Sequence, residues 1–289
     1  MVSTVYNMVI LFCSNSKGII KAMIKNSFGA TPSQPDIRDY KLSVSISKLP
    51  LTYINQPTKI KSQGAQSTCV AHALSSLVEF HNFKETQLYT RFSTDFIYGC
   101  RFESDYFGEG MSLRDGLKVI QKYGDVEYLL LPGNTDVSKA FSKVHQNFEA
   151  LRLEAYPNRI TTYYKIKSLD ELKYALYHDG PVAASMRWYS ESSVDKNGIY
   201  HYNPSNSYFG HAVLIIGWDE DNLIVQNSWG ILFGKKGLFY VPIKQMNEVF
   251  KELYGTTDDI TNIKVPSKTT KLCSPLINLI LKVIQYFIN

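Results

Sequence analysis

Cysteine is scarce in this sequence, with four residues in a chain of 289. They stand at positions 13, 69, 100 and 273, and no two of them form a C-x-x-C pair. Small secreted domains held by disulfides carry denser cysteine, and zinc sites need closely spaced ligands. We therefore expect free thiols, no metal site and a reducing environment, either intracellular or virion-associated, with secretion left open.

Dense basic blocks and long apolar runs are also missing. Lys and Arg outnumber Asp and Glu by 31 to 26, but they form no cluster, so we expect no nucleic-acid partner. The apolar run MVILFC at residues 8–13 follows no basic residue, which does not match a signal peptide. These absences leave an ordinary globular protein, with 44% hydrophobic and 20% charged residues.

The C-terminal stretch at 275–289, PLINLILKVIQYFIN, is apolar but too short and too interrupted to predict a transmembrane helix. Its polar residues fall on one narrow helical stripe, which predicts an amphipathic helix. Such a helix either docks on the protein's own domain or contacts a membrane surface or a partner. Both alternatives stay open, and with them a peripheral membrane association.

Hydrophobic periodicity predicts helices in the first part of the chain and strands in the second. Helices are expected from residue 67, with Ser67 or Thr68 as N-cap, and over 112–123 and 168–178. After residue 181 the pattern changes to short β-branched and aromatic runs: PVAASMRW, HAVLIIGW, LIVQNSW and GLFYVPI. This order indicates an α+β fold whose unlike halves enclose a cleft between them.

Cys69 stands where a run of small polar residues gives way to the first helix. The positive end of a helix dipole favours a thiolate, so the position predicts an activated thiol, although most lone cysteines are buried packing residues. A nucleophilic thiolate needs a proton shuttle, and histidine titrates in the right range. His211 opens one predicted strand and Asn227 ends the next, so a hairpin through DEDN would bring them together. The asparagine could then orient the imidazole.

These segments resemble those of the papain-like (C1) cysteine peptidases, especially the cysteine-poor branch of prokaryotes and large DNA viruses. QGAQSTCVA is similar to the family's nucleophile segment, GHAVLIIGW to its histidine strand and NSWG to its asparagine segment, in the family's order. The resemblance covers about residues 49–245. It implies a two-subdomain fold in which a helical half carries the nucleophile and an antiparallel β half carries the histidine and asparagine.

The resemblance also implies roles for further residues. Gln63, six positions before Cys69, would supply its side-chain amide to the oxyanion, and Trp229 would shield the His211–Asn227 hydrogen bond from water. Gly110 would pair its backbone with a peptide substrate. Three residues would lie near the S2 pocket and favour an apolar side chain at P2: Leu113, Phe209 and Ala212.

The resemblance divides the chain into three regions. Residues 1–48 would be an N-terminal extension or short pro-segment, residues 49–255 the catalytic domain and residues 256–289 a tail with the amphipathic helix. Within the first region, residues 29–48 would either brace the back of the domain or cover the cleft.

The function expected is that of a cysteine endopeptidase acting on proteins or peptides without a cofactor. An isopeptidase, deamidase or transpeptidase on the same scaffold is the alternative. An inactive binding module is a further one, disfavoured because every chemical group is present.

Overall fold

The protein's structure, a computed structural model, describes residues 29–34, 36, 48–101, 109–133, 137–189, 194–204 and 208–258. Contacts divide the chain into one unit, Met1–Asp259, and a second, Ile260–Asn289. All described residues belong to the first unit. The expected helix at 275–289, most of the expected pro-segment, and the cysteines at 13 and 273 lie outside the described residues.

One half of the unit is a sheet in the order β4-β9-β5-β6-β7-β8, with β2 beside β6. All of these pairs are antiparallel. The inner strands read as nearly continuous apolar runs because both of their faces are buried. The strands are β2 (Tyr53–Ile54), β4 (Thr162–Lys165), β5 (Val182–Tyr189), β6 (Tyr208–Trp218), β7 (Asn222–Gln226), β8 (Leu238–Pro242) and β9 (Phe250–Thr257).

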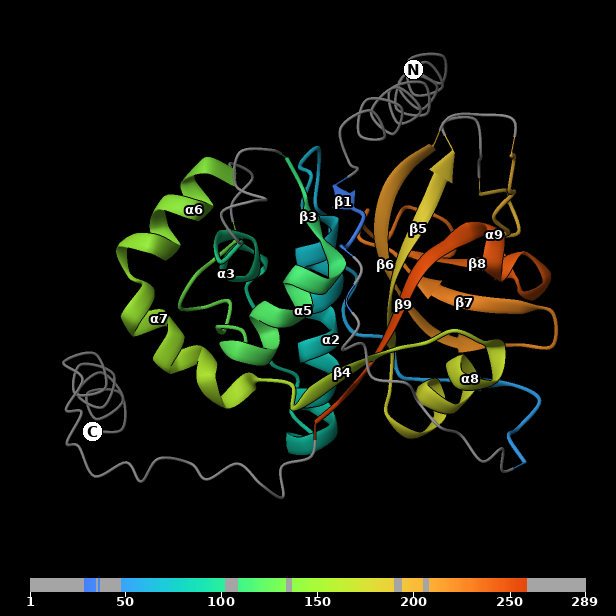
Figure 1. Cartoon of the computed structure of the whole chain (residues 1–289), viewed down its shortest axis with the longest axis horizontal. Helices are drawn as coiled ribbons and strands as arrows, with labels where there is room; N and C mark the ends of the chain where they lie inside the picture. Colours follow the sequence, from blue (N-terminus) through green and yellow to red (C-terminus); the bar gives the residue numbers. More distant parts are fainter. Residues whose placement is uncertain are drawn as a thin grey trace, which may run out of the picture. The chain divides into compact units, whose positions relative to one another are not determined.

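The other half is helical and is built around α2 (Cys69–Thr86). Figure 1 shows α2 along the boundary between the halves, with the sheet on one side of it and the remaining helices of this half on the other. They are α3 (Thr94–Gly99), α5 (Leu113–Lys122), α6 (Val137–Gln146), α7 (Phe148–Ala155) and the 3₁₀ turn η1 (Tyr156–Asn158). Three further short elements accompany the sheet: α8 (Leu169–His178), η2 (Ile243–Gln245) and α9 (Met246–Val249).

A two-stranded parallel pair lies between the halves. It joins β1 (Ala30–Thr31) to β3 (Met111–Ser112), and Figure 1 shows β1 between β3 and β6. Two hydrophobic cores lie on either side of this β1–β3 pair. One packs the inner face of α2 against α5 and one face of β5 and β6, and the other fills the opposite face of the sheet.

The α+β prediction is confirmed, and the expected helices and strands appear within three residues of their predicted bounds. Ser112 and Ser168 cap α5 and α8 by accepting hydrogen bonds from backbone N–H groups. The N-cap of α2 differs, because the Thr68 side chain makes no capping bond. Strands β4 and β9 were not predicted.

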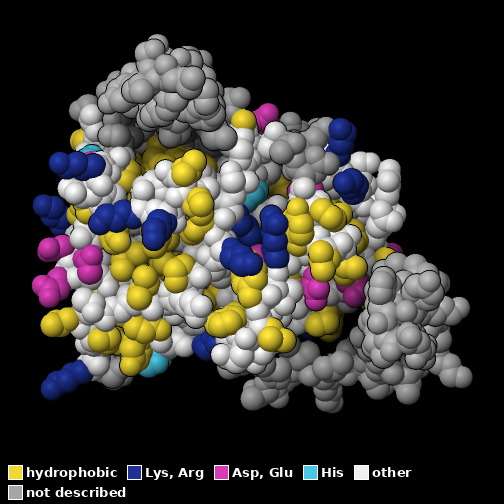
Figure 2. All heavy atoms as spheres, turned by 180° about the vertical axis from the view of Figure 1, so that it is seen from behind, with side chains coloured by type: hydrophobic (Ala, Val, Ile, Leu, Met, Phe, Trp, Pro, Cys, Tyr) yellow, Lys and Arg dark blue, Asp and Glu magenta, His cyan; other side chains and the backbone are white. Residues whose placement is uncertain are grey.

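The surface seen from behind carries several hydrophobic patches between Lys and Arg side chains (Figure 2). Large apolar side chains are exposed mainly in loops, among them Leu129, Ile231 and Leu232. Among the described residues, no helix has both the length and the apolar character needed to cross a membrane.

Candidate active site

The thiol of Cys69 lies at the first residue of α2 and is fully buried. The helix is buried on all sides around its first three turns because it runs between the sheet and the other helices, and it therefore fixes the thiol rigidly. Backbone N–H groups of Ala212 and Gly29 lie within hydrogen-bonding reach of the sulfur. Since Ala212 follows His211 directly, the thiol faces the strand that carries the histidine.

His211 and Asn227 meet through the β6–β7 hairpin. The hairpin turns at residues 219–222, as predicted, and brings His211 Nε2 within 2.8 Å of Asn227 Oδ1. With Nε2 donating to the amide oxygen, the Nδ1 side of the ring becomes the position for exchanging a proton with the substrate. Both side chains are buried, His211 completely.

Trp229 covers this pair, as the sequence predicts. Its ring stacks on the imidazole of His211, with 4.6 Å between centroids and 28° between planes. Trp188 packs edge-on against both rings, at 4.7 Å from Trp229 and 5.8 Å from His211. An apolar cover of this kind keeps water from competing for the His211–Asn227 hydrogen bond.

Burial is the main influence on the pKa values of Cys69 and His211. It raises the pKa of the Cys69 thiol to about 11, although the N–H groups of Ala212 and Gly29 oppose the rise. It also lowers the pKa of His211 to about 4, against the bond to Asn227, which raises it. The expected thiolate is therefore not the form favoured in this structure, because burial outweighs the helix terminus.

Gln63 is held beside the thiol by three hydrogen bonds. Its backbone N–H donates to Ser228 O at 2.9 Å, and its Oε1 accepts from Ser228 Oγ at 2.7 Å. Its Nε2 donates to Gln66 O at 2.7 Å. Ser228 therefore fixes the oxygen end of the Gln63 amide, and the carbonyl of Gln66 fixes its nitrogen end.

A segment of the chain itself occupies the cleft. In this cleft segment, residues 29–34, Gly29 O accepts a hydrogen bond from Met111 N at 2.8 Å. The packing is so close that a Cβ on Gly29 would lie 2.1 Å from Ser67 O. A Cβ on Gly210 would lie 1.9 Å from Ala30 O. Residues 29–34, the described beginning of the stretch 29–48, therefore lie over the thiol.

Side chains of the protein itself hold both backbone polar groups of Gly110. Gly110 was predicted to pair its backbone with a peptide, but its N–H donates to Tyr98 Oη at 3.0 Å and its carbonyl accepts from Arg101 at 2.9 Å. The N–H that faces the cleft segment belongs to Met111. The absence of a side chain at Gly110 makes room for the cleft segment, because a Cβ there would lie 2.2 Å from Gly29 O.

The residues predicted near the S2 pocket divide between two faces of the sheet. Leu113 and Ala212 are fully buried and share the core cluster that contains Cys69. Phe209 precedes Ala212 by three positions on one regular strand, so it alternates onto the opposite face, and it is 44% exposed. The structure does not bring Phe209 to the wall formed by the other two.

Four residues that help to build the site were missed from the sequence. Trp188 reaches the imidazole because β5 pairs with β6, which a single sequence does not disclose. Ser228 anchors Gln63, and its place inside NSWG could have drawn attention to it. Tyr98 of α3 and Arg101, which follows that helix, hold the backbone of Gly110, with no local pattern to mark them.

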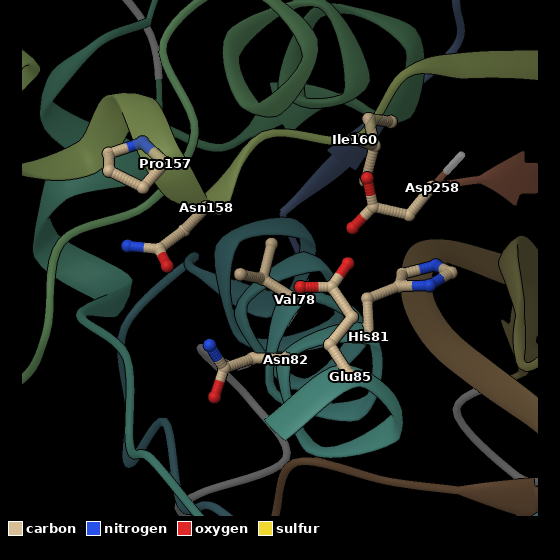
Figure 3. A pocket seen from close by; sticks show the side chains of 8 residues that line it. All are labelled: Val78, His81, Asn82, Glu85, Pro157, Asn158, Ile160 and Asp258. Carbon is tan, nitrogen blue, oxygen red and sulfur yellow. The ribbon is translucent and has the colours of Figure 1, made fainter. Parts of the chain in front are cut away.

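A separate hollow lies away from these residues, between α2, η1 and the end of β9 (Figure 3). The carboxylates of Glu85 and Asp258 point into it. His81 also lines it, but its Nε2 contacts Thr256 Oγ1 at 2.9 Å, which ties it to the sheet. Its pKa is lowered to about 4 by burial, in keeping with a neutral packing residue.

The described part of the chain carries neither a candidate metal site nor a disulfide. No group of three His, Cys, Asp or Glu side chains there could hold a metal ion. Cys69 and Cys100, the two cysteines within it, form no disulfide.

Comparison with known proteins gives a consistent assignment. A sequence model described as "Papain family cysteine protease" matches residues 53–254, more than half of the chain. Cathepsin B-like cysteine proteinase 3 of Caenorhabditis elegans is 43% identical over 79 residues, which are 26% of this chain and 21% of that protein. The chain thus spans about a quarter or less of the length of the nematode relatives it matches.

A viral relative and two solved structures match over most of the chain. A peptidase C1-like protein of Acanthamoeba polyphaga mimivirus is 26% identical over 286 residues, covering 83% of this chain and 90% of that one. Xylellain, a cysteine protease from Xylella fastidiosa, superposes with a TM-score of 0.72 at 24% identity, over 81% of this chain and 97% of its own.

ProCathepsin B S9 from Trypanosoma congolense superposes with a TM-score of 0.64 at 16% identity, over 83% of this chain and 88% of its own. At these identities the structural likeness shows the fold alone, and the fold is the two-halved arrangement expected from the sequence. Together with the family model that matches from β2 to β9, it shows that the chain belongs to the papain family of cysteine proteases.

Proposed function

We propose that the protein is a cysteine endopeptidase that hydrolyses peptide bonds through an acyl-enzyme. Two contacts carry this proposal. His211 Nε2 lies 2.8 Å from Asn227 Oδ1, and the N–H of Ala212, the next residue on the same strand, lies within hydrogen-bonding reach of the Cys69 sulfur. A structural cysteine needs no oriented imidazole beside it. A nucleophilic thiol does, because only the thiolate attacks a carbonyl.

The proposed reaction starts when His211 takes the proton of Cys69 and forms an ion pair with the thiolate. The thiolate attacks the scissile carbonyl, and the Cys69 N–H and the Gln63 side chain donate to the oxyanion. His211 then gives its proton to the leaving amine. In the second half, His211 activates water, which hydrolyses the acyl-enzyme and restores the thiol. Asn227 stabilises the charged imidazole in both halves.

The proposed substrates are peptides or unfolded protein segments. They would pair with the backbone N–H of Met111, where Gly29 O now accepts a hydrogen bond. Apolar walls at Leu113 and Ala212 would contact the P2 side chain, as predicted from the sequence. A reducing compartment, inside a cell or in a virion, and a membrane or partner contact through residues 275–289 complete the proposal.

The cleft segment would keep the enzyme inactive until it leaves. It covers the sulfur, pairs with β3 and excludes the water that would stabilise an ion pair. Departure of the segment would hydrate Cys69 and His211, relieving the burial that now keeps both groups neutral.

Peptide cleavage by the full chain tests this function. Gly29→Leu provides an open form, since no side chain fits against Ser67. A peptide library should be cleaved by this variant, and not when Cys69→Ala is added. Product masses separate hydrolysis from its alternatives, because hydrolysis adds one water, whereas transpeptidation joins fragments and deamidation leaves the backbone intact. Failure of Gly29→Leu to cleave any peptide or to react at Cys69 with an epoxysuccinyl inhibitor would contradict the proposal.

A further inference from the structure

The N-terminus of α2 lacks the side-chain cap that usually orients the first turn of a helix. An N-cap residue is normally extended, and its side-chain oxygen accepts a hydrogen bond from a backbone N–H two or three residues on. Thr68 instead has φ −109° and ψ 19°, and its buried Oγ1 makes no hydrogen bond with the described residues. The peptide group that joins Thr68 to Cys69 must therefore be oriented by another contact.

That contact comes from His72, one turn further along α2. Side chains of a helix lean toward its N-terminus, so the imidazole reaches back to the first turn. Its Nδ1 lies 2.9 Å from Thr68 O, which also accepts from the backbone N–H of His72 at 3.0 Å. A carbonyl oxygen only accepts hydrogen bonds, so Nδ1 carries a proton and donates it. One residue thus supplies two donors to Thr68 O.

The surroundings keep the His72 ring in the neutral form. Burial lowers its pKa to about 4, and the positive charges of Lys61 and Arg91 act in the same direction. The backbone carbonyls of Thr68 and Ser62, both within hydrogen-bonding reach of the ring, oppose this shift. At neutral pH the ring therefore carries one proton, and the bond to Thr68 O keeps that proton on Nδ1.

The direction of the Thr68 carbonyl determines the direction of the Cys69 N–H. The peptide bond between them is trans, so its C=O and its N–H point in opposite directions. Because His72 holds the oxygen on the helix side, the Cys69 N–H points out of the N-terminus of α2, where the first N–H groups of a helix have no intrahelical partner. Two hydrogen bonds to the oxygen also polarise the amide and make its N–H a stronger donor.

A small cavity between α2 and the strands β6 and β7 borders His72. Its walls include Ser76 and two residues of the candidate site, Asn227 and Ser228. Space on this side means that close packing alone does not fix the imidazole, so its hydrogen bond to Thr68 O decides where the ring lies. The space also lets other side chains replace histidine without overpacking.

We propose that His72 is a positioning residue for the oxyanion site, because its ring N–H fixes the Thr68–Cys69 peptide group and thereby aims the Cys69 N–H at the substrate carbonyl. The inference rests on the proposed function and names the residue that prepares one of its two oxyanion donors. His72 acts through Thr68 O and takes no part in proton transfer. Since the oxygen becomes negative only in the transition state, loss of His72 should lower kcat and leave KM nearly unchanged.

Two variants of similar shape test the proposal in the full-length Gly29→Leu protein. Leucine and asparagine both branch at Cγ, but only asparagine places an N–H group close to the position of the imidazole Nδ1. We expect His72→Leu to lower kcat for a peptide about tenfold, less than the 10²–10³-fold expected for a donor removed outright. His72→Asn should keep kcat within about threefold of the parent protein, because it retains the hydrogen bond.

A reaction without an oxyanion separates positioning from a general loss of structure. Alkylation of Cys69 by iodoacetamide should change by less than about threefold in His72→Leu. His81→Leu is the matched control, since it removes a second buried histidine from α2 whose ring contacts Thr256 Oγ1 instead. It should retain kcat. If His72→Leu does not fold, His72→Phe, which also lacks the donor, takes its place in the comparison.

Several outcomes would overturn the inference. Unchanged kcat in His72→Leu, or a His72→Asn variant as slow as His72→Leu, would exclude the positioning role while the proposed peptidase function stands. An equal loss in peptide cleavage and alkylation would show that His72 only supports the fold.

An activated ester gives the same comparison if no peptide is cleaved. The Cys69 thiolate attacks the carbonyl of a p-nitrophenyl ester, the S–C bond forms through the same oxyanion, and the C–O bond breaks to release p-nitrophenolate. The release should be slower in His72→Leu and recover in His72→Asn. Equal rates would contradict the role of His72, and no acylation at all would contradict both proposals.

Discussion

At the scale of single residues, the site combines groups that are neutral as long as they are buried. Cys69 and His211 have pKa values displaced in opposite directions by the same cause, loss of solvent. An ion pair between them would need either water or strong hydrogen bonds to replace hydration. Asn227 supplies one such bond to the imidazole, and the N–H groups at the thiol supply others.

Gln63 provides a prediction at this scale. In the Gly29→Leu background, Gln63→Ala should lower kcat/KM for peptides by about 10²–10³-fold, because one oxyanion donor is lost. Alkylation of Cys69 by iodoacetamide, which forms no oxyanion, should change by less than about threefold. Ser228→Ala, which removes only the hydroxyl that orients Gln63, should show a smaller loss of the same kind. An equal loss in peptide cleavage and alkylation would assign Gln63 a structural role instead.

The sequence predicted the chemical groups better than the substrate contacts. Cys69, His211 and Asn227 each stand in a distinctive segment, and strand pairing brings the last two together within hydrogen-bonding distance. The substrate contacts expected of Gly110 and Phe209 stay predictions. A strand as short as β3 has no pattern to fix its register, and in the structure the N–H of Met111 faces the cleft segment. Phe209 alternates away from Ala212 because β6 runs without a bulge there.

At the scale of elements, α2 and β1 determine access to the thiol. The helix was predictable from its apolar pattern and from the polar residues before it. Strand β1 was not, because Ala30 and Thr31 form a strand only against Met111 and Ser112 of β3. Strands β4 and β9 escaped prediction for a similar reason, since pairing with β5 and burial of one face decide their conformation more than local propensity does.

The cleft segment gives the prediction at this scale. Gly29→Leu places a side chain where only 2.1 Å separates a Cβ from Ser67 O, so the segment should leave the cleft. Peptidase activity of the full chain should rise at least about tenfold, which corresponds to losing about 1.4 kcal/mol of segment binding. Gly133→Leu, in an exposed turn where the nearest atom is 3.3 Å from the added Cβ, is the matched control. Equal activity of the wild type and Gly29→Leu would rule out inhibition by the segment.

At the scale of the whole molecule, buried polar groups tie the loops around the nucleophile to α2. Lys61 contacts Glu79 at 2.7 Å and donates to Ser75 at 2.8 Å, so the loop before the nucleophile is tied to the middle of α2. Glu79 also accepts from Phe92 N at 3.1 Å. These contacts stiffen the frame behind the cleft, and a buried pair of this kind becomes costly when one partner is removed.

Three buried histidines make the fold sensitive to acid. Burial lowers the pKa values of His72, His81 and His211 to about 4, below the ordinary 6.5. Between these two pKa values, the three histidines bind protons in the unfolded chain but stay neutral in the folded chain. The free energy of unfolding should therefore be retained above pH 6.5 and fall as the pH drops toward 4, by about 2–3 kcal/mol per histidine at about pH 4.5.

His81→Gln tests this sensitivity and leaves the proposed catalytic residues unchanged. Urea unfolding at about pH 7 and pH 4.5 should show that the variant loses about 2–3 kcal/mol less than the wild type between the two conditions. His201→Gln, which replaces an exposed histidine, should lose as much as the wild type. The account of acid sensitivity would be wrong if all three proteins lost the same amount.

The central claim is that Cys69 and His211 form a reactive pair once the cleft segment leaves, and the pH dependence of Cys69 alkylation tests it most directly. In Gly29→Leu, the rate measured by mass spectrometry should reach a plateau well below pH 8.5, where a lone thiol is still protonated. His211→Ala should abolish that plateau, and the wild type should react slowly throughout. A single rise near the pKa of an ordinary thiol in Gly29→Leu, unchanged by His211→Ala, would contradict the account.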